Sequence, residues 1–184
     1  QIARDGVRPS FAFFGFLCLA TQLAAIAVIT DSAVLVVGAM VVAPDFAPVA
    51  GMMIATVLRR RALFWDSLVL GVIGFGLAIA TVVCTALAAR WLGWYDVTTL
   101  LAPRPQTSFI WHPDKWSFIV ACLAGMAGVL SLTSGRSSVL VGVFISVTTV
   151  PAAGNLGLGL AFQETSEILG SAQQLGLNVA GLMV

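Results

Sequence analysis

The sequence predicts an all-α integral membrane protein with six membrane segments, arranged as two inverted repeats of three segments. Of its 184 residues, 59% are hydrophobic and only 9% are charged, whereas a soluble domain carries roughly 25% charged residues. The charged residues leave six apolar intervals close to the length of about 20 residues that crosses a bilayer as a helix. Part of the second interval also recurs in the fifth, which indicates a duplicated unit.

Charged residues and helix-breaking residues set the limits of each predicted segment. The first begins at Pro9 and ends before Asp31, and the second ends before the arginines at 59–61. A loop rich in tryptophan separates the third segment from the fourth and is expected to lie at the outer membrane surface. The six ranges are 9–30, 32–58, 67–89, 116–135, 137–163 and from about 168 onward.

These ranges predict a single transmembrane domain over residues 1–184. Repeat one covers 10–89, the interfacial outer loop covers 90–115, and repeat two covers 116–184. Because the chain opens without a methionine and stops inside an apolar run, we expect it to be a fragment that lacks soluble flanking regions.

The distribution of basic residues predicts that the N-terminus is cytoplasmic, because cytoplasmic loops are enriched in Lys and Arg. If all six segments cross, six basic residues lie inside and three outside; if segments 2 and 5 are re-entrant, the count is five against four. Full crossing is therefore favoured. The inner set is Arg4, Arg8, Arg59, Arg60, Arg61 and Arg136, and the outer set is Arg90, Arg104 and Lys115.

The internal repeat rests on two matched stretches. Residues 32–38 (SAVLVVG) match residues 137–142 (SSVLVG) with one deletion, and residues 48–51 (PVAG) match residues 151–154 (PAAG). Three crossings per unit force the second unit to enter the membrane from the opposite side. Inverted repeats with interrupted middle helices are typical of secondary transporters, whose sites lie at the midplane where the breaks meet.

Both middle segments carry residues that interrupt a helix. Pro44 and Pro48 lie four residues apart in segment 2, and Pro151 is followed by Gly154 in segment 5. Proline removes a backbone donor and clashes with the preceding turn, so we expect both segments to be broken there. The alternative is a tilted, proline-kinked helix without a site.

Asp45 is the leading candidate for a binding residue. It has 13 uncharged residues on either side, and a charge at such a depth costs about 2.5–3.5 kcal/mol on insertion scales. We therefore expect it to bind a substrate cation, a coupling cation or a proton; no other cofactor is expected. The alternative is a protonated carboxyl that only plugs the break. The full predicted substrate or ion site is Asp45, Pro44, Pro48, Thr148, Thr149, Pro151 and Asn155.

Other features exclude several classes of function. A net charge of +1 argues against nucleic acid as a partner. Cys18, Cys84 and Cys122 lie far apart in apolar runs and are expected to pack, and Gln22 is expected to make an ordinary interhelical hydrogen bond. The sequence has no Ser/His/Asp set, paired intramembrane aspartates or phosphate loop, so an enzyme is not expected.

The run Gly-Ala-Met-Val-Val-Ala-Pro at 38–44, followed by Pro48, resembles a family of prokaryotic hydrophobic membrane proteins described as domain of unknown function 389. The resemblance covers segments one to six. It implies a multi-pass protein of the prokaryotic inner (plasma) membrane, often with an added soluble domain, and it implies no substrate. Members often have an apolar residue after the first proline, so Asp45 departs from the pattern.

These observations favour a secondary transporter or ion-coupled permease for a small solute or ion. Two alternatives remain: an oligomeric structural or sensory membrane module, and a channel lined by the carbonyls that the prolines leave unpaired. In each case the expected partners are the lipid bilayer and further copies of the chain.

Overall fold

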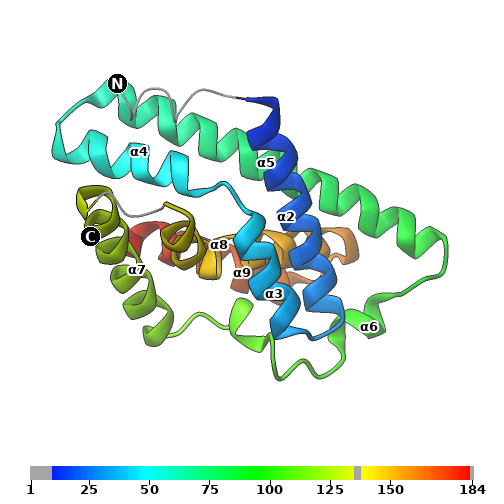
Figure 1. Cartoon of the computed structure of the whole chain (residues 1–184). Helices are drawn as coiled ribbons and strands as arrows, with labels where there is room; N and C mark the ends of the chain where they lie inside the picture. The colour runs from blue at the N-terminus through cyan, green and yellow to red at the C-terminus, as the bar shows by residue number, and fades with distance from the viewer. Residues whose placement is uncertain (1–9, 135–137, 183–184) are drawn as a thin grey trace.

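The computed structural model describes residues 10–134 and 138–182, and all regular structure in this part of the chain is helical (Figure 1). The helices are α2 (Phe11–Ile29), α3 (Ala33–Val42), α4 (Phe46–Val57), α5 (Arg61–Trp91), α6 (Val97–Leu101), the 3-10 helix η1 (Ser108–Ile110), α7 (Lys115–Ser134), α8 (Ser138–Phe162) and α9 (Thr165–Leu182).

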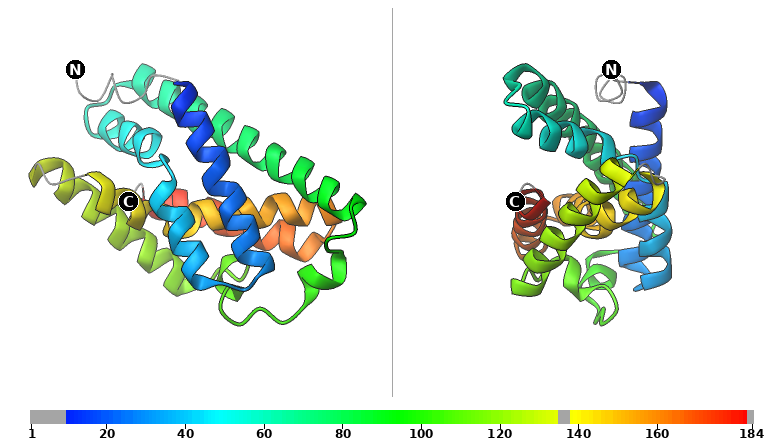
Figure 2. Two further views of the ribbon diagram at one scale, coloured as in Figure 1. Left: turned by 45° about the vertical axis from the view of Figure 1, so that its right-hand side comes forward. Right: turned by 60° about the vertical axis from the view of Figure 1, so that its left-hand side comes forward.

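Helices α2 and α3 form an antiparallel pair joined by a tight turn. The Ser10 hydroxyl accepts a hydrogen bond from the Phe13 amide and caps α2, and the Ser32 hydroxyl caps α3 in the same way. Between them Asp31 adopts a left-handed backbone conformation, with a φ of 46°. The two helices therefore lie side by side with Asp31 at the end of the pair (Figures 1 and 2).

The predicted break in segment 2 is confirmed. Helix α3 ends at Val42, α4 begins at Phe46, and the two parts are bent by 62°. Ala43 is extended, with φ −70° and ψ 129°, because the ring of Pro44 disfavours the helical conformation of the residue before it. Pro48 lies in the first turn of α4, where the amide that it lacks has no intrahelical partner.

The prediction that segment 5 is broken is wrong. Helix α8 continues through Pro151, from Ser138 to Phe162. A single proline removes one backbone hydrogen bond, and packing from neighbouring helices can hold the rest of the helix together. Here α8 packs against α2, α3, α5, α7 and α9 and passes through the middle of the molecule (Figures 1 and 2).

Small residues allow this close packing around α8. A Cβ on Gly154 would lie 2.9 Å from the Ala25 amide of α2, and a Cβ on Gly157 would lie 2.7 Å from the Val82 side chain of α5. Such close approach of backbones is typical of helix packing in membranes.

Two described helices, α2 and α5, are long and apolar enough to cross a membrane, and the bent pair α3–α4 adds a third candidate. Shorter apolar stretches lie in α7 and α8. Helix α5 has 31 residues, or about 46 Å at 1.5 Å per residue. The chain is thus a helical protein with apolar helices suited to a membrane, while six crossings and an inverted repeat remain predictions.

Apolar side chains fill the core of this fold and also cover much of its outer surface. Large apolar side chains of α5 and α7 point outward, whereas the buried face of α9 is polar. An extensive exposed apolar surface is unfavourable in water and favourable against lipid. The outward residues include Trp65, Val69, Val72 and Ile73 of α5 and Ile119, Leu123 and Met126 of α7.

Candidate functional site

Asp45 lies in the break of segment 2 and is fully buried. The Thr149 hydroxyl of α8 donates a hydrogen bond to its Oδ2 at 2.7 Å. Asp45 also occupies the N-cap position of α4, where the positive end of the helix dipole stabilises a carboxylate. Segments 2 and 5 therefore meet at a buried carboxyl group, where the sequence placed a site.

The remaining predicted residues of this site are distributed along α3–α4 and α8. Pro44 lies in the break beside Asp45, and Pro48 is buried and faces α5, where its Cβ is 3.7 Å from a Cβ built on Gly71. Pro151 is buried within α8, two residues beyond Thr149. Thr148 belongs to α8, but its side chain lies outside the described part of the chain.

Asn155 belongs to a second buried cluster, with Arg104, Glu167 and Ser171. Its Oδ1 accepts from Arg104 Nη1 at 3.3 Å, and its Nδ2 donates to Glu167 Oε2 at 2.7 Å and to Ser171 Oγ at 2.8 Å. Arg104 Nη2 forms an ion pair with Glu167 Oε1. Thr149 and Asn155 are six residues apart on α8, so the two clusters are separated by about 9 Å along the helix.

Arg104 enters the helix bundle from the loop that precedes η1. Its guanidinium carbon lies 3.8 Å from the centre of the Trp111 ring, and the residue is 5% exposed. Burial lowers the pKa of the Arg104 guanidinium below its ordinary value, while Glu167 and Asp31 act in the opposite direction.

The Asp31 carboxylate holds this loop against the α2–α3 turn. Its Oδ1 accepts from the Thr107 amide at 2.9 Å, from the Thr107 hydroxyl at 2.9 Å and from the Gln106 amide at 3.1 Å. The loop at 90–115, which was expected to lie at the membrane surface, thus also places the Arg104 guanidinium in the interior.

Sequence reasoning missed Arg104 and Glu167 as functional residues, because both were counted as surface charges. The signal for Glu167 is the spacing of polar residues in α9. Glu167, Ser171, Gln174 and Asn178 repeat every three or four residues and are all buried, which places them on one helix face. No local pattern identifies Arg104, since its position depends on how the loop folds back.

The polar face of α9 continues beyond the ion pair. Gln174 Nε2 donates to Asn178 Oδ1 at 3.2 Å, while Gln174 Oε1 and Asn178 Nδ2 are buried without a hydrogen-bond partner among the described residues. Such groups cost free energy unless a water or ligand binds them. The interior along α9 therefore has spare hydrogen-bonding capacity.

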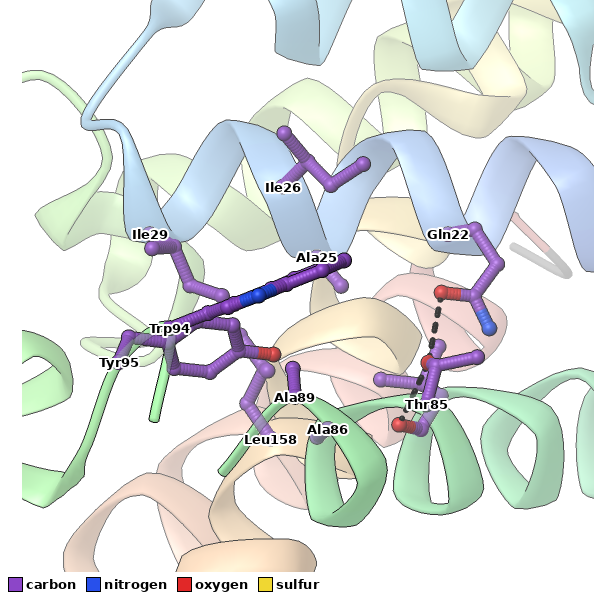
Figure 3. A pocket seen from close by; sticks show the side chains of 11 residues that line it. Gln22, Ala25, Ile26, Ile29, Thr85, Ala86, Ala89, Trp94, Tyr95 and Leu158 are labelled. Carbon is purple, nitrogen blue, oxygen red and sulfur yellow. Dashed lines mark hydrogen bonds between the residues drawn. The ribbon is translucent and has the colours of Figure 1, made fainter. Parts of the chain in front are cut away.

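A pocket of about 310 Å³ opens between α2 and α5 (Figure 3). Trp94 and Tyr95 lie at one end, where burial raises the pKa of the tyrosine hydroxyl. At the other end the Thr85 hydroxyl donates to Gln22 Oε1 at 3.0 Å, so the expected interhelical bond of Gln22 is confirmed. The pocket lining is otherwise apolar, and no charged side chain belongs to it.

Among the described residues no group of three or more His, Cys, Asp or Glu side chains is placed to hold a metal ion. Asp45 and Thr149 together offer one carboxylate and one hydroxyl oxygen. This pair suits a proton or a weakly held cation with other oxygen ligands better than a tightly bound transition metal.

The fold and these two buried clusters define a helical protein with apolar helices suited to a membrane and ionisable groups in its interior. Residues 40–184 match the family described as domain of unknown function (DUF389). The chain belongs to this family, as its Gly-Ala-Met-Val-Val-Ala-Pro run predicted.

A similar protein is an uncharacterized protein of Methanocaldococcus jannaschii, which is 26% identical over 189 aligned positions. The alignment includes all of this chain and 56% of that relative, so the chain spans about half the length of the relative. No solved structure matches the chain.

Proposed function

We propose that the chain is the membrane domain of an ion-coupled secondary transporter for a small solute or ion. In this proposal Asp45 binds the coupling proton or cation. The site lies within the bilayer of a prokaryotic plasma membrane, the N-terminus is cytoplasmic, and copies of the chain associate. The protein catalyses no reaction and binds no nucleic acid.

The observation that supports this proposal best is the Asp45–Thr149 pair. A fully buried carboxyl lies at a break between two helices of an apolar segment and contacts a hydroxyl on the central helix α8. Ionisable residues at such positions are expensive and usually mark an ion or substrate pathway. A break in the helix also supplies backbone groups and a helix N-terminus that can take part in binding.

In this proposal the charge of Asp45 changes as the ion binds and leaves. A protonated or cation-bound Asp45 is neutral overall, so it can remain buried at a small cost, whereas an uncompensated charge prefers a hydrated cavity. Binding of the ion would therefore favour a conformation in which the site is closed, and its release would favour one in which the site is open to water. This dependence is what couples an ion gradient to movement of a solute.

Flux measurements with Asp45→Asn test the proposal. The chain is reconstituted into vesicles that contain a pH-sensitive dye, and gradients of Na⁺, K⁺, nitrate or phosphate are imposed one at a time. At least one gradient should drive proton or ion movement above that of protein-free vesicles. Asp45→Asn should abolish this flux, since the amide keeps the shape and the hydrogen bond from Thr149 but cannot bind a proton.

Asp66→Asn is the matched control, because Asp66 is an exposed carboxyl near the start of α5, and it should keep the flux of the parent. Flux that is unchanged by Asp45→Asn at every pH would remove Asp45 from the mechanism. Absence of flux in the parent under all four gradients, with the protein correctly inserted, would favour the structural or sensory module.

A further inference from the structure

The carboxylate of Glu167 occupies a position where hydrogen-bond donors converge. Arg104 Nη2 binds one carboxylate oxygen, and Asn155 Nδ2 donates to the other at 2.7 Å. The donors come from the loop before η1 and from α8, whereas Glu167 comes from α9. Glu167 and Arg104 are 3% and 5% exposed, and Asn155 is fully buried. The surroundings of Glu167 are therefore those of a buried anion site, filled by a side chain of the protein.

This site has more donors than Glu167 uses. Arg104 Nε is buried and has no hydrogen-bond partner among the described residues. The Ser171 hydroxyl accepts from Asn155 Nδ2 at 2.8 Å, which leaves its own hydrogen for another acceptor. A guanidinium edge binds the two oxygens of a planar oxyanion. Arg104 Nε and the Ser171 hydroxyl are therefore the donors available to a second small oxyanion beside Glu167.

Charge balance determines when such an anion can enter. With Glu167 ionised, the buried pair with Arg104 is neutral. A further anion would leave one uncompensated negative charge in the interior, which is strongly unfavourable. The charge balances if Glu167 takes up one proton from solution and forms an O–H bond on a carboxylate oxygen. The anion then becomes the partner of Arg104, and the site is again neutral.

The groups around Glu167 are consistent with this exchange. Arg104 is the charged group that contacts it, Asn155 faces it from α8, and Ser171 follows it on α9. Helix α7 meets α9 at the opposite end, near Gly181. The nearby Asp31 carboxylate is bound to the amides of the Arg104 loop and interacts electrostatically with Arg104.

We propose that Arg104, Asn155 and Ser171 form a binding site for a small oxyanion, of the size of nitrate or a monocarboxylate, and that the anion binds together with a proton on Glu167. The proposal rests on the proposed transport function and names its substrate class. Stacking on Trp111 fixes the guanidinium plane, and the contacts of Asp31 fix the loop that carries it.

Binding of nitrate to the purified chain in detergent tests this site. Nitrate is planar and is never protonated near neutral pH, so any proton taken up must be bound by the protein. In weakly buffered solution between pH 5 and pH 7, calorimetry should give saturable binding, and a pH indicator should report about one proton taken up per nitrate. Because one proton is bound with each nitrate, the affinity should fall tenfold per pH unit wherever that uptake is observed.

Glu167→Gln should bind nitrate without proton uptake and with an affinity that no longer depends on pH, because the amide is permanently neutral. Arg104→Lys should weaken nitrate binding at least tenfold, since the ammonium cannot offer a planar edge. Arg90→Lys, at the exposed end of α5, is the matched control and should bind as the parent does.

Three results would overturn the anion site: no saturable binding of nitrate or acetate by the parent, nitrate binding without proton uptake, or equal binding by the parent and Arg104→Lys. These measurements need no vesicle. A chain that binds nitrate with a proton but moves no solute keeps the site and rejects transport. A chain that transports a solute through Asp45 but does not bind nitrate rejects only the anion site.

Discussion

Replacement of Gly170 by alanine should disrupt the contact between α9 and the loop that carries Arg104. A Cβ at this position would lie 2.0 Å from the backbone oxygen of Trp111, whereas ordinary contacts begin at 3.4 Å. The two backbones must therefore separate by about 1.0 Å to reach the shortest Cβ contact at 3.0 Å, and by about 1.4 Å to reach an ordinary one. A backbone oxygen cannot rotate away as a side chain can, so the strain must displace Trp111, on which Arg104 stacks.

The size of the effect follows from two opposing terms. Overpacking of this kind costs about 1–3 kcal/mol, while alanine in place of glycine favours a helix by about 1 kcal/mol. Because the clash is with backbone, we expect the upper part of the range and a net loss of about 1–2 kcal/mol for Gly170→Ala. Gly176→Ala is the matched control on the same helix, with no atom within 4 Å of its Cβ, and should gain about 0.5–1 kcal/mol.

The assay is unfolding in mixed micelles with increasing fractions of dodecyl sulfate, followed by helical circular dichroism. Gly170→Ala should unfold at a lower detergent fraction than the parent and Gly176→Ala at an equal or higher one, with a difference between the variants of about 1.5–3 kcal/mol. If both variants unfold at the same detergent fraction, the described contact between α9 and Trp111 does not exist.

Two further predictions concern the polar ends of the helices. In intact cells, an impermeant thiol reagent should label Gln106→Cys in the outer loop but not Arg60→Cys between α4 and α5. Both variants are made in a background without native cysteines. The reverse labelling pattern would show that the topology is inverted. Asp114 caps α7, and the hydrogen bond from the Ser117 amide at 2.8 Å lowers the pKa of its carboxyl below the ordinary value. Asp114→Ala should therefore destabilise the protein at pH 7 and lose this effect as the pH falls through the folded pKa; a constant difference across that range would exclude the cap.

The sequence predicts the break in segment 2 because this feature depends on a local property, and it names Thr149 among the residues that could join Asp45. Pro44 constrains the residue before it whatever surrounds it, and a carboxyl in an apolar interval must find a polar partner inside the protein. The choice of Thr149 followed from the matched Pro-x-Ala-Gly stretches, which placed segments 2 and 5 at one site.

The features that the sequence does not predict depend on packing between distant parts of the chain. Pro151 resembles Pro48 in its sequence context, yet α8 continues through it because α8 is packed among α2, α3, α4, α5, α7 and α9. Asn155 was expected beside Asp45, but the continuous helix turns it toward Glu167. The burial of Arg104 depends on the contacts of Asp31 with Gln106 and Thr107, across more than 70 residues of chain, which no local pattern reveals.

The most direct test of a transport role is whether the buried interior can be reached from both sides of the membrane. Ser171 is fully buried, and its neighbour Ala172, about 100° further around α9, is exposed. Each is replaced by cysteine in a background where Cys18, Cys84 and Cys122 are alanine, and a small, charged thiol reagent is applied to the outside or the inside of reconstituted vesicles. The transport account predicts that Ser171→Cys reacts from either side, while Ala172→Cys, facing lipid, reacts from neither. A Ser171→Cys chain that reacts from one side only, or from neither, would contradict alternating access to this site.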